Sequence, residues 1–467
     1  MADRKRKRLI FSAFTENKHG AYWGGLWRYD WGWTLDANDI DDWVAYVKLL
    51  EKGKFDFLFL ADTLGIYDTH GGNGNAAMRH GVSIPENDPF ILSSALATAT
   101  KNLGFIFSHA PVQSPPYDFA RKMSTIDHLS KGRVGWNIVT GFTHSGARNF
   151  GADRLPAHAD RYRAADEYVD ILYRLWEGSW EEDAFVRDTA RGVFIEPDKV
   201  HPIDFEGVFY KVAGPHQSSP SPQRTPFLCQ AGASDVGRAF AARHAEAIFM
   251  PTPSKGATRT HVHELRELAK GYGRQPDDII CLMGAWFVIG GTEEEARRKH
   301  ADIVEKSDAE AFLVDSSGKS GVDFSKIDLD TDLREISADG IQGVLRAFLK
   351  DNPARKYTFR DYAKYKLNRV FIGTPEQIAD QLEDWQATTG LDGFQVFGMP
   401  STSAISDFVE GLRPTLLKRG LMQEDYAQGT LREKIFGLDR YLPASHPAKK
   451  HNRALQATMQ RAVGQSG

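Results

Sequence analysis

The sequence is poor in cysteine and has no excess of positive charge, and each absence excludes a class of protein. Only 2 cysteines occur among 467 residues, which excludes a disulfide-stapled scaffold. The formal net charge is −4, so a basic surface for nucleic acid is not expected. No apolar run is long enough to span a membrane or to act as a secretory signal. We therefore expect a cytoplasmic protein that binds neither nucleic acid nor membrane.

Several sequence motifs of enzymes are also missing. The glycines of residues 69–85 do not form a dinucleotide fingerprint, because no helix with the right spacing opens there, and we expect a mobile loop instead. There is no G-x-S-x-G motif, and neither Cys229 nor Cys281 has the setting of a nucleophile, since both fall inside predicted buried strands. No pair of histidines has metal-ligand spacing, so no metal site is expected. A bound organic cofactor would have to supply difficult chemistry.

Short apolar runs that alternate with helical patterns are what the chain does contain. Each run is too short for a helix and is rich in β-branched or aromatic residues, as strands buried on both faces are. These strands are expected at residues 9–14, 55–61, 103–108, 133–139, 226–230, 247–250, 279–289 and 392–397. Eight strands alternating with helices favour a (β/α)8 TIM barrel. The alternative is a doubly wound sheet, which would need a glycine-rich loop after strand one, where this chain is aromatic.

The domain organisation follows from this pattern. Residues 1–419 are expected to form a single barrel domain, with insertions at about residues 177–225 and 307–368. Residues 420–467 show little periodicity and are expected to pack as a tail on the barrel or on a partner subunit.

Polar residues stand where several predicted strands end. Asp62, Asn137, Thr140 and Ser234 lie there, and the carboxyl ends of parallel strands are where such folds place their chemistry. The small residues Ala231, Gly232 and Ala233 lead into a helix capped by Ser234, which predicts exposed amides for an anion. Arg161 and Tyr162 open the helix after strand four and could complete a phosphate clamp, although Arg161 alone would more often form a surface ion pair.

Longer motifs carry a resemblance. GRVGWNIVT at residues 132–140, HADRYRAADEY at 158–168, SPSPQRTPFLCQAGAS at 219–234 and YAQGTLREKIFG at 426–437 resemble the bacterial-luciferase-like flavin monooxygenases. The similar group contains the nitrilotriacetate, dibenzothiophene-sulfone, dimethyl-sulfide and long-chain-alkane monooxygenases and riboflavin lyase. The resemblance runs from about strand one to Phe436. It implies a barrel that holds FMN at the carboxyl ends of its strands.

The resemblance also implies roles for individual residues. Asp62 and Asn137 match positions that meet the flavin ring, and Tyr67, Val139 and Thr140 match the lining around it. The residues that match the phosphate and ribityl side are Arg161, Tyr162, Ala231, Gly232, Ala233 and Ser234. Such enzymes take reduced FMN from a separate NAD(P)H-flavin reductase, react it with dioxygen, and form homodimers or homotetramers. Lys18 departs from the alkane enzyme, which has a cysteine there, and His109 and Phe142 also depart from the group's usual residues.

Histidines and aromatic residues suggest the reacting end of the site. His109 and His158 flank a predicted strand end and a predicted helix start, so either could be catalytic by carrying protons near the flavin. Residues 15–38 hold six aromatic side chains, Trp27 among them, and this loop leaves the end of a barrel strand. Together with Phe142, these flat faces predict a ring-bearing organic substrate, although any one of them could pack on the barrel instead.

The leading hypothesis is therefore a two-component, FMN-dependent monooxygenase acting on a small organic substrate. A flavin-degrading lyase of the riboflavin lyase type is the alternative within the family. A deazaflavin-dependent reductase and a non-catalytic flavin-binding protein remain open on the same barrel.

Overall fold

Eight parallel strands close into a barrel, which confirms the predicted (β/α)8 fold. The computed structural model describes residues 8–19, 24–232, 234–250, 254–335, 354, 356–358, 360–361 and 370–452. The barrel strands are β1 (Ile10–Glu16), β2 (Phe57–Ala61), β3 (Gly104–His109), β4 (Val134–Ile138), β9 (Phe227–Gln230), β10 (Ala247–Met250), β11 (Ile280–Ile289) and β13 (Gly393–Phe397). Neighbouring strands run in the order β10, β9, β4, β3, β2, β1, β13, β11, and pairing of β10 with β11 closes the ring.

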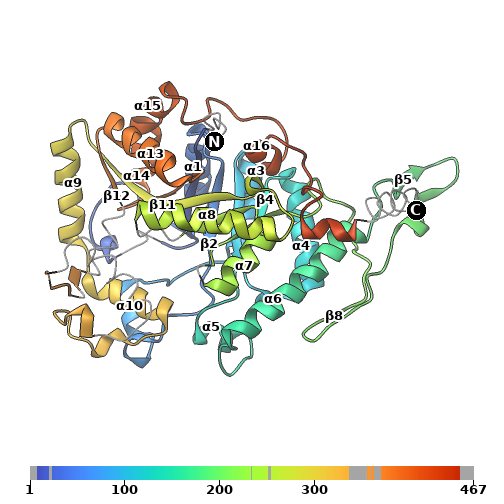
Figure 1. Cartoon of the computed structure of the whole chain (residues 1–467), viewed down its shortest axis with the longest axis horizontal. Coiled ribbons are helices and arrows are strands. Elements are labelled where there is room, and N and C mark those ends of the chain that lie inside the picture. The colour runs from blue at the N-terminus through green and yellow to red at the C-terminus, as the bar shows by residue number, and fades with distance from the viewer. Residues whose placement is uncertain are drawn as a thin grey trace.

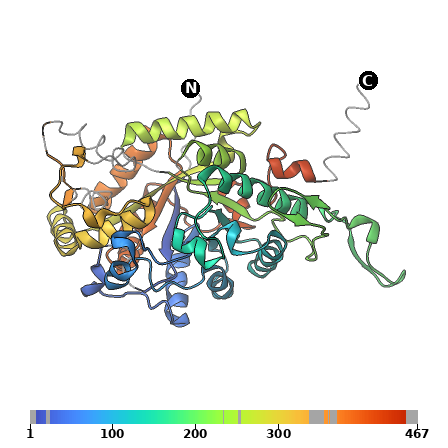
Figure 2. The same cartoon turned by 90° about the horizontal axis from the view of Figure 1, so that it is seen from below.

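Helices surround this ring, as Figures 1 and 2 show. They are α1 (Ile40–Lys52), α3 (Pro89–Ala99), α4 (Pro116–Ser130), α6 (His158–Tyr173), α7 (Asp235–His244), α8 (Lys255–Gly271), α9 (Glu293–Lys306), α13 (Pro375–Thr389), α14 (Ser403–Asp407) and α15 (Arg413–Lys418). Thr292 followed by Glu295 and Thr374 followed by Gln377 are sequence patterns that predict helix caps, and both caps are present: Thr292 accepts a hydrogen bond from the Glu295 amide, and Thr374 forms a reciprocal capping box with Gln377. The sequence predicts one helix over residues 404–419. In the structure the π-helix Phe408–Leu412 lies within this segment, between α14 and α15.

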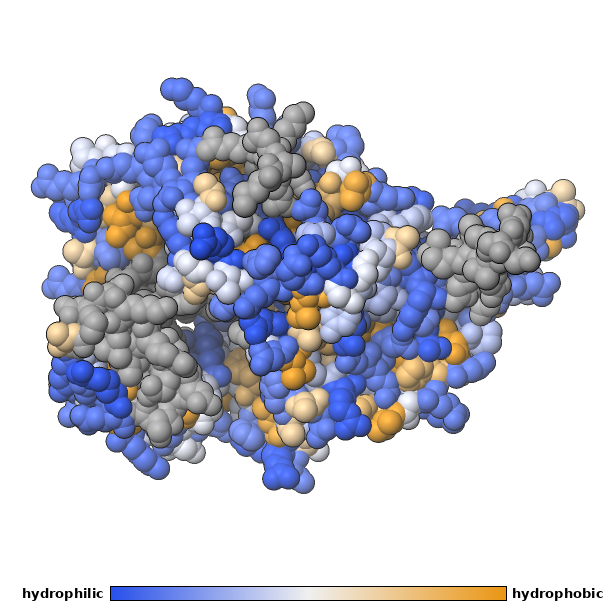
Figure 3. All heavy atoms as spheres, viewed as in Figure 1, coloured by the Kyte–Doolittle hydropathy of each residue, from blue (hydrophilic) through white to orange (hydrophobic). Residues whose placement is uncertain are grey.

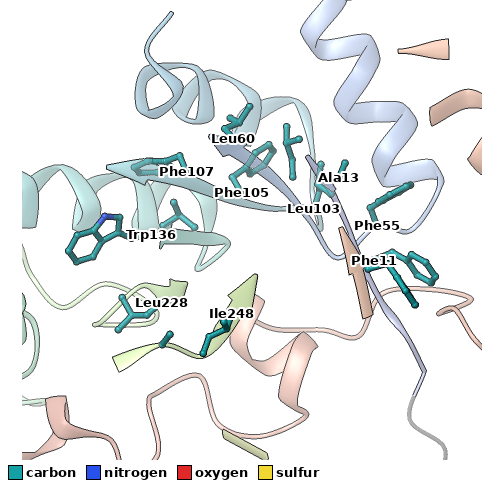
Figure 4. Packing of buried hydrophobic residues seen from close by; sticks show 14 of the residues in the cluster. Phe11, Ala13, Phe55, Leu60, Leu103, Phe105, Phe107, Trp136, Leu228 and Ile248 are labelled. Atoms are coloured by element: carbon teal, nitrogen blue, oxygen red, sulfur yellow. The ribbon is translucent and has the colours of Figure 1, made fainter. Parts of the chain in front are cut away.

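The outward faces of the strands make the larger core. Phe11, Leu60, Phe107, Trp136 and Leu228 point from successive strands toward the helices (Figure 4) and are almost fully buried. Strand side chains alternate between the two faces, so every second residue packs under a helix and the others fill the barrel. This two-sided burial explains why the strands read as continuous apolar runs.

The barrel interior is filled by a separate cluster of side chains. Its buried members from the strands are Ile10, Phe57, Phe59, Ile106, Phe227, Cys229, Ala247, Ile280 and Leu282. Gly284 leaves room for the Phe397 ring, which would lie 2.6 Å from a Cβ at that position. Cys229 and Cys281 are buried and are not joined by a disulfide, in agreement with the sequence.

The tail after residue 419 closes the amino-terminal end of the barrel. Its helix α16 (Leu431–Phe436) inserts Leu431 into the interior cluster, with Ile435 and Phe436 packed beside it. In Figure 1, α16 lies near the described N-terminal strand, at the end of the barrel opposite α5 (His144–Asn149) and α10 (Ala309–Ser320). The described part of the tail therefore packs on the barrel of its own chain.

A buried ion pair anchors this closing helix. The Arg432 guanidinium donates to both Glu246 carboxylate oxygens at 2.6 and 2.9 Å, and also to the carbonyls of Thr225, Pro226 and Arg440. Both side chains are 2% exposed. Glu246 also accepts the Leu228 amide at 2.9 Å, so the ion pair connects the tail to β9 and to the start of β10.

The two predicted insertions contain short elements of their own. The first forms the hairpins β5 (Phe185–Asp188)–β6 (Val193–Ile195) and β7 (Phe205–Glu206)–β8 (Lys211–Val212), and the β5–β6 hairpin projects from the body in Figures 1 and 2. The face seen in Figure 3 is mostly hydrophilic, with hydrophobic side chains in scattered patches. The described part of the second insertion includes α10.

Two local predictions are corrected by the structure. Residues 69–85 are not simply a loop, because they contain the turn His70–Gly72 and the helix α2 (Asn75–His80), which packs against α10. The sequence also missed β12 (Val370–Gly373), which pairs with Trp286–Ile289. β11 is long enough to pair first with β13 and then, farther along, with β12.

The ion pair at the closed end predicts a large stability effect. Arg432→Met should lower the free energy of unfolding by roughly 3–5 kcal/mol, because it leaves the Glu246 carboxylate buried without its cation. Urea denaturation followed by circular dichroism measures this. Arg298→Met, on the exposed face of α9, is the matched control and should stay within about 0.5 kcal/mol of wild type. A loss below about 1 kcal/mol for Arg432→Met would contradict the role given to the pair.

Candidate active site

A layer of phenylalanine rings forms the floor of the carboxyl-terminal end of the barrel. Phe14 stacks on Phe59 with ring centroids 5.5 Å apart and contacts Phe397 at 4.7 Å, while Phe249 meets Phe59 edge-on at 4.4 Å. These rings come from β1, β2, β10 and β13. Phe14, Phe249 and Phe397 are only partly buried, so this floor faces an accessible space. We call that space the mouth of the barrel.

Asp62 and Asn137 lie above the floor, at the ends of β2 and β4. Asn137 is 2% exposed; its amide donates to Ser108 Oγ at 2.8 Å, and its Oδ1 has no hydrogen-bond partner among the described residues. Asp62 accepts from Gln113 Nε2 at 3.0 Å. Burial raises the pKa of the Asp62 carboxyl to about 6, against the opposing effect of the Gln113 hydrogen bond. The Asn137 side-chain carbonyl is buried without a hydrogen-bond partner, and the Asp62 carboxyl is poorly hydrated. Both groups could therefore bond to a polar ligand that fills the mouth.

The residues that the sequence predicts to bind an anion lie at and just before the start of α7, and we call Gly232, Ser234 and the adjacent Tyr162 the cradle. Ser234 Oγ accepts from the Gly237 amide at 3.1 Å, and a Cβ on Gly232 would lie 2.9 Å from the Gly237 Cα, a backbone atom, so the chain passes too close for a side chain there. Tyr162 accepts from Gln230 at 3.3 Å. Burial raises the pKa of the Tyr162 phenol, while hydrogen bonds from Gln230, Thr140 and Ser234 oppose that shift. The structure thus brings Thr140, Tyr162, Gly232 and Ser234 together.

Two further groups surround this cradle. Arg161 donates from Nη1 to the Gly141 carbonyl at 2.5 Å, and its buried Nε has no partner among the described residues. Burial lowers the pKa of the guanidinium. Ala231 is exposed beside Gly232, and Ala233 lies outside the described residues. A helix N-terminus with an adjacent, incompletely bonded arginine fits a phosphate group.

An apolar cavity of about 260 Å³ opens between the mouth and α6. Asp62, Val139, Thr140 and Arg161 contribute to its wall on the side of the mouth. Its other walls are mostly apolar and include Leu64, Pro111, Val112, Phe142, Leu155, Ala164, Phe209 and Tyr210. A cavity of this kind accepts an apolar or ring-bearing body and excludes water around it.

The remaining predicted lining residues lie around this cavity and the mouth. Tyr67 is 1% exposed and packs under Gly318 of α10, where a Cβ would lie 2.2 Å from its ring. Phe142 is 40% exposed and meets Tyr67 edge-on, with centroids 6.0 Å apart. Trp27 is 53% exposed, donates to the His80 carbonyl at 3.0 Å and borders a small space shared with Glu16 and Lys18.

Three carboxylates and one lysine gather at the edge of the mouth, and sequence reasoning missed two of them. We call Glu16, Asp62 and Glu86 the acidic cluster. Lys18 pairs with Glu16, both side chains being about 5% exposed, and its backbone forms an isolated antiparallel bridge with Glu86. Alternation along β1 could have identified Glu16, because it shares a face with Phe14. Glu86 has no such signal, since it lies in a loop.

Glu86 is the unusual member of the acidic cluster. Neither of its carboxylate oxygens has a hydrogen-bond partner among the described residues. Burial, then the charges of Glu16 and Asp62, raise the pKa of this carboxyl to about 9, while Lys18 and the nearby Thr63 amide lower it. Glu86 is therefore a neutral acid at neutral pH.

The structure separates the two predicted histidines. His109 stacks on Phe119 at 4.3 Å and bonds Ser114 Oγ at 2.9 Å, and burial lowers its pKa to about 3. A histidine that stays neutral above that pH is poorly suited to carry protons near neutrality. His158 is exposed at the start of α6, with Nε2 3.4 Å from Ser234 Oγ. His158 is thus the one of the pair that lies at the cradle.

Most of the described aromatic side chains in the loop after β1 lie away from the mouth. Trp31 donates to the Leu26 carbonyl and lies 4.8 Å from Lys306 of α9, and Trp33 donates to Asp42 of α1. Tyr29 lies edge-on to Trp31. These rings pack on the outer helices, and residues 20–23, which include two of the six aromatics, lie outside the described residues. Trp27 is the described member that stays near the mouth.

The described residues contain neither a metal-binding cluster nor a membrane-spanning helix. No group of three or more histidine, cysteine, aspartate or glutamate side chains is arranged to hold a metal ion there. No helix in the same residues combines the length and apolar character that a membrane crossing requires.

The raised pKa of Glu86 predicts a pH-dependent stability. Between about pH 4.5 and 9 the folded chain holds a proton on Glu86 that the unfolded chain has lost, so stability falls as pH rises through this window. Glu86→Gln removes the dependence. From pH 5 to pH 8, its free energy of unfolding relative to wild type should rise by roughly 1–3 kcal/mol. Denaturant titrations at both pH values measure this. The control is Glu424→Gln, which changes an exposed carboxylate. If the difference in unfolding free energy between Glu86→Gln and wild type is the same at pH 5 and pH 8, the prediction is refuted.

Comparison with known proteins agrees with this geometry. The model of the luciferase-like monooxygenase family matches residues 15–392. The dimethyl-sulfide monooxygenase of Hyphomicrobium sulfonivorans is 38% identical over 454 residues, covering 96% of this chain and 95% of that protein. The long-chain alkane monooxygenase of Geobacillus thermodenitrificans is 40% identical over 446 residues, covering 95% and 98%.

A solved structure of riboflavin lyase with modified FMN and riboflavin superposes with a TM-score of 0.86 at 32% identity, covering 95% of this chain and 99% of that one. The match extends over almost the whole chain in both sequence and structure. This protein is therefore a member of the luciferase-like monooxygenase family and an enzyme of the monooxygenase class.

Proposed function

We propose that this chain is the oxygenase component of a two-component system, which binds reduced FMN and uses dioxygen to oxidise a small, ring-bearing organic substrate. The observation that carries the proposal is the cradle at Gly232 and Ser234, which lies beside a mouth floored by phenylalanine rings. The absence of a dinucleotide fingerprint in the sequence supports supply of reduced FMN by a separate NAD(P)H-flavin reductase. We further propose a cytoplasmic homodimer or homotetramer.

The residues fit FMN on both of its sides. Arg161 and Ser234 would hold the phosphate, with the small residues 231–233 allowing close approach, and Tyr162 would lie beside the ribityl chain. Asn137 Oδ1 would accept from a ring N–H, which would satisfy an atom that is otherwise orphaned. Bound reduced FMN would supply the electrons that activate dioxygen.

The rest of the site would protect and orient the reactants. Once ligands fill the mouth, the phenylalanine floor and the apolar walls of the cavity would exclude water from it, which would limit loss of reactive species to solvent. Val139, Phe142 and Trp27 would contact the substrate or ring edges. His158 lies at the cradle, so it would have to reach the flavin through Ser234 or through movement of its exposed side chain to carry a proton. The catalytic role of His109 stays a prediction, with its buried ring against it.

Riboflavin lyase-type chemistry is the second candidate. The superposition with riboflavin lyase and the aromatic residues Trp27 and Phe142 near the mouth favour it. In that case a flavin itself would be the ring-bearing substrate, and reduced flavin and dioxygen would still be required.

The cradle predicts weaker cofactor binding in a double variant. Arg161→Ala with Ser234→Ala should weaken binding of reduced FMN by about two decades, because one charge-assisted contact and one neutral hydrogen bond are lost. Anaerobic fluorescence titration measures the dissociation constant. The matched control is Arg163→Ala with Thr292→Ala, which removes a neighbouring arginine of α6 and another helix cap. An unchanged constant in the test variant would place the phosphate elsewhere.

The oxygenase reaction and its substrate class are tested together. The enzyme, a flavin reductase, NADH and FMN are incubated under ¹⁸O₂ with riboflavin, a tricyclic sulfone, a long alkane or a chelated polycarboxylate. We expect labelled product, with the best turnover from a ring-bearing compound, because the cavity is apolar and the mouth is acidic. Cleavage products from riboflavin would favour the second candidate, and preference for the alkane or the polycarboxylate would refute the ring-bearing substrate.

A further inference from the structure

The β7–β8 hairpin forms one wall of the apolar cavity. Phe209 and Tyr210, at its turn, line that cavity together with Ala164 of α6. Phe209 is 41% exposed, and the Arg163 guanidinium lies 5.7 Å from the centre of its ring. Tyr210 packs edge-on against Tyr168 of α6, with ring centroids 5.5 Å apart. A large, partly exposed ring in the wall of an apolar cavity is placed to contact a ligand there.

The hairpin is too short to fix its own position. β7 and β8 contribute two residue pairs, Phe205 with Val212 and Glu206 with Lys211. A two-stranded ribbon of this size is marginally stable in isolation. Its place beside the cavity therefore depends on contacts with α6.

Glu167 of α6 binds the turn of the hairpin. Its carboxylate accepts hydrogen bonds from three successive backbone amides, those of Val208, Phe209 and Tyr210, at 2.9, 2.8 and 2.6 Å. Successive amides that converge on one anion form a compact anion-binding turn, and hydrogen bonds to a charged group are stronger than neutral ones. Gly207 allows this approach, because a Cβ at that position would collide with the Glu167 carboxylate. One side chain thereby sets where the Phe209 ring lies.

We propose that the cavity receives the ring system of the substrate, that Phe209 determines the size of the ring system accepted, and that Glu167 is the residue that positions Phe209. This inference rests on the proposed oxygenase function and concerns the substrate specificity of the same site. Glu167 acts through Phe209 and has no part in the chemical step.

The shape and polarity of the cavity suit a planar apolar body. Its volume is about 260 Å³, and Asp62, Thr140 and Arg161 lie in its wall on the side of the mouth. Elsewhere its walls are mostly apolar and include the rings of Phe142 and Phe209. A ring system placed there lies among apolar faces, with one end toward the mouth. The reacting end of the substrate is therefore at the mouth and the bulk of its rings is under the hairpin.

A positioning role for Glu167 differs from a purely structural one in what it predicts. Val208 and Phe209 are exposed residues, so water can replace the carboxylate at their amides. Loss of the carboxylate should therefore leave the chain folded and release the turn from its fixed place. The effect is expected in the choice of ligand and not in the stability of the protein.

The test uses two probes, naphthalene and the larger pyrene. Equilibrium dialysis against the full-length enzyme measures both affinities, without cofactor and, anaerobically, with reduced FMN. Phe209→Ala should weaken naphthalene binding about tenfold, because a ring contact is lost. It should also raise the affinity for pyrene relative to naphthalene roughly tenfold or more, because the wall is opened. Val208→Ala, which changes the neighbouring exposed side chain of the same turn, is the matched control and should behave as wild type.

Variants of Glu167 test the positioning role. Glu167→Ala should shift the ratio of the two affinities in the same direction as Phe209→Ala. Glu167→Gln should restore part of the wild-type ratio, since its amide oxygen can still accept from the turn. The double variant Glu167→Ala with Phe209→Ala should have the same ratio as Phe209→Ala alone, because the ring through which Glu167 acts is already absent. Glu206→Gln, at an exposed residue of the same hairpin, controls for the loss of a carboxylate.

The outcomes separate this inference from the proposed function. No binding of naphthalene to wild type, or a wild-type ratio in Phe209→Ala, would overturn the specificity role of Phe209. Additive effects of the two alanine substitutions on the ratio would overturn the positioning role of Glu167. Failure of reduced FMN to bind would overturn the oxygenase proposal, whereas a changed ratio measured without cofactor would still support the wall that Phe209 forms.

Discussion

The packing of four phenylalanine rings inside the barrel is the constraint on which the site depends. Phe14, Phe59, Phe249 and Phe397 come from four strands that meet only if the barrel closes in the observed register. A slip of one residue would turn these rings outward and separate them from one another. The rings also separate the packed interior from the mouth. The polar groups above them therefore lie in a poorly hydrated environment, where charges interact strongly.

That environment explains the electrostatics of the mouth. Asp62 and Glu86 have raised pKa values first because burial disfavours their charged forms, and then because neighbouring carboxylates, Glu16 in both cases, repel those charged forms. Similar carboxylates on the surface, such as Asp384 beside Lys255, have lowered pKa values instead. The pKa of a carboxyl group is thus raised at the mouth and lowered in an ion pair at the surface. Groups held in a perturbed state at one end of a barrel are characteristic of functional sites.

The sequence predicted the fold more fully than the site. Two-sided burial made each barrel strand a continuous apolar run, and the caps at Thr292 and Thr374 identified helix starts. β12 was missed because it pairs only with the far end of a long strand. At the site, strand-end position identified Asp62, Asn137 and Thr140. It could not identify Glu86, whose role depends on the loop meeting Lys18, nor show that His109 points toward Phe119. Contacts between distant segments leave no periodic signal.

The closing helix at the other end of the barrel has a consequence for synthesis of the protein. Leu431 and Arg432 complete the interior and neutralise Glu246, yet they are made after every strand of the barrel. While the ribosome is still adding residues 398–430, the nascent barrel has an open, apolar base and an unpaired buried carboxylate. Domains usually fold as units during translation, and exposed apolar surface promotes association of incomplete chains. Docking of residues 431–436 is therefore the step that makes the barrel self-contained.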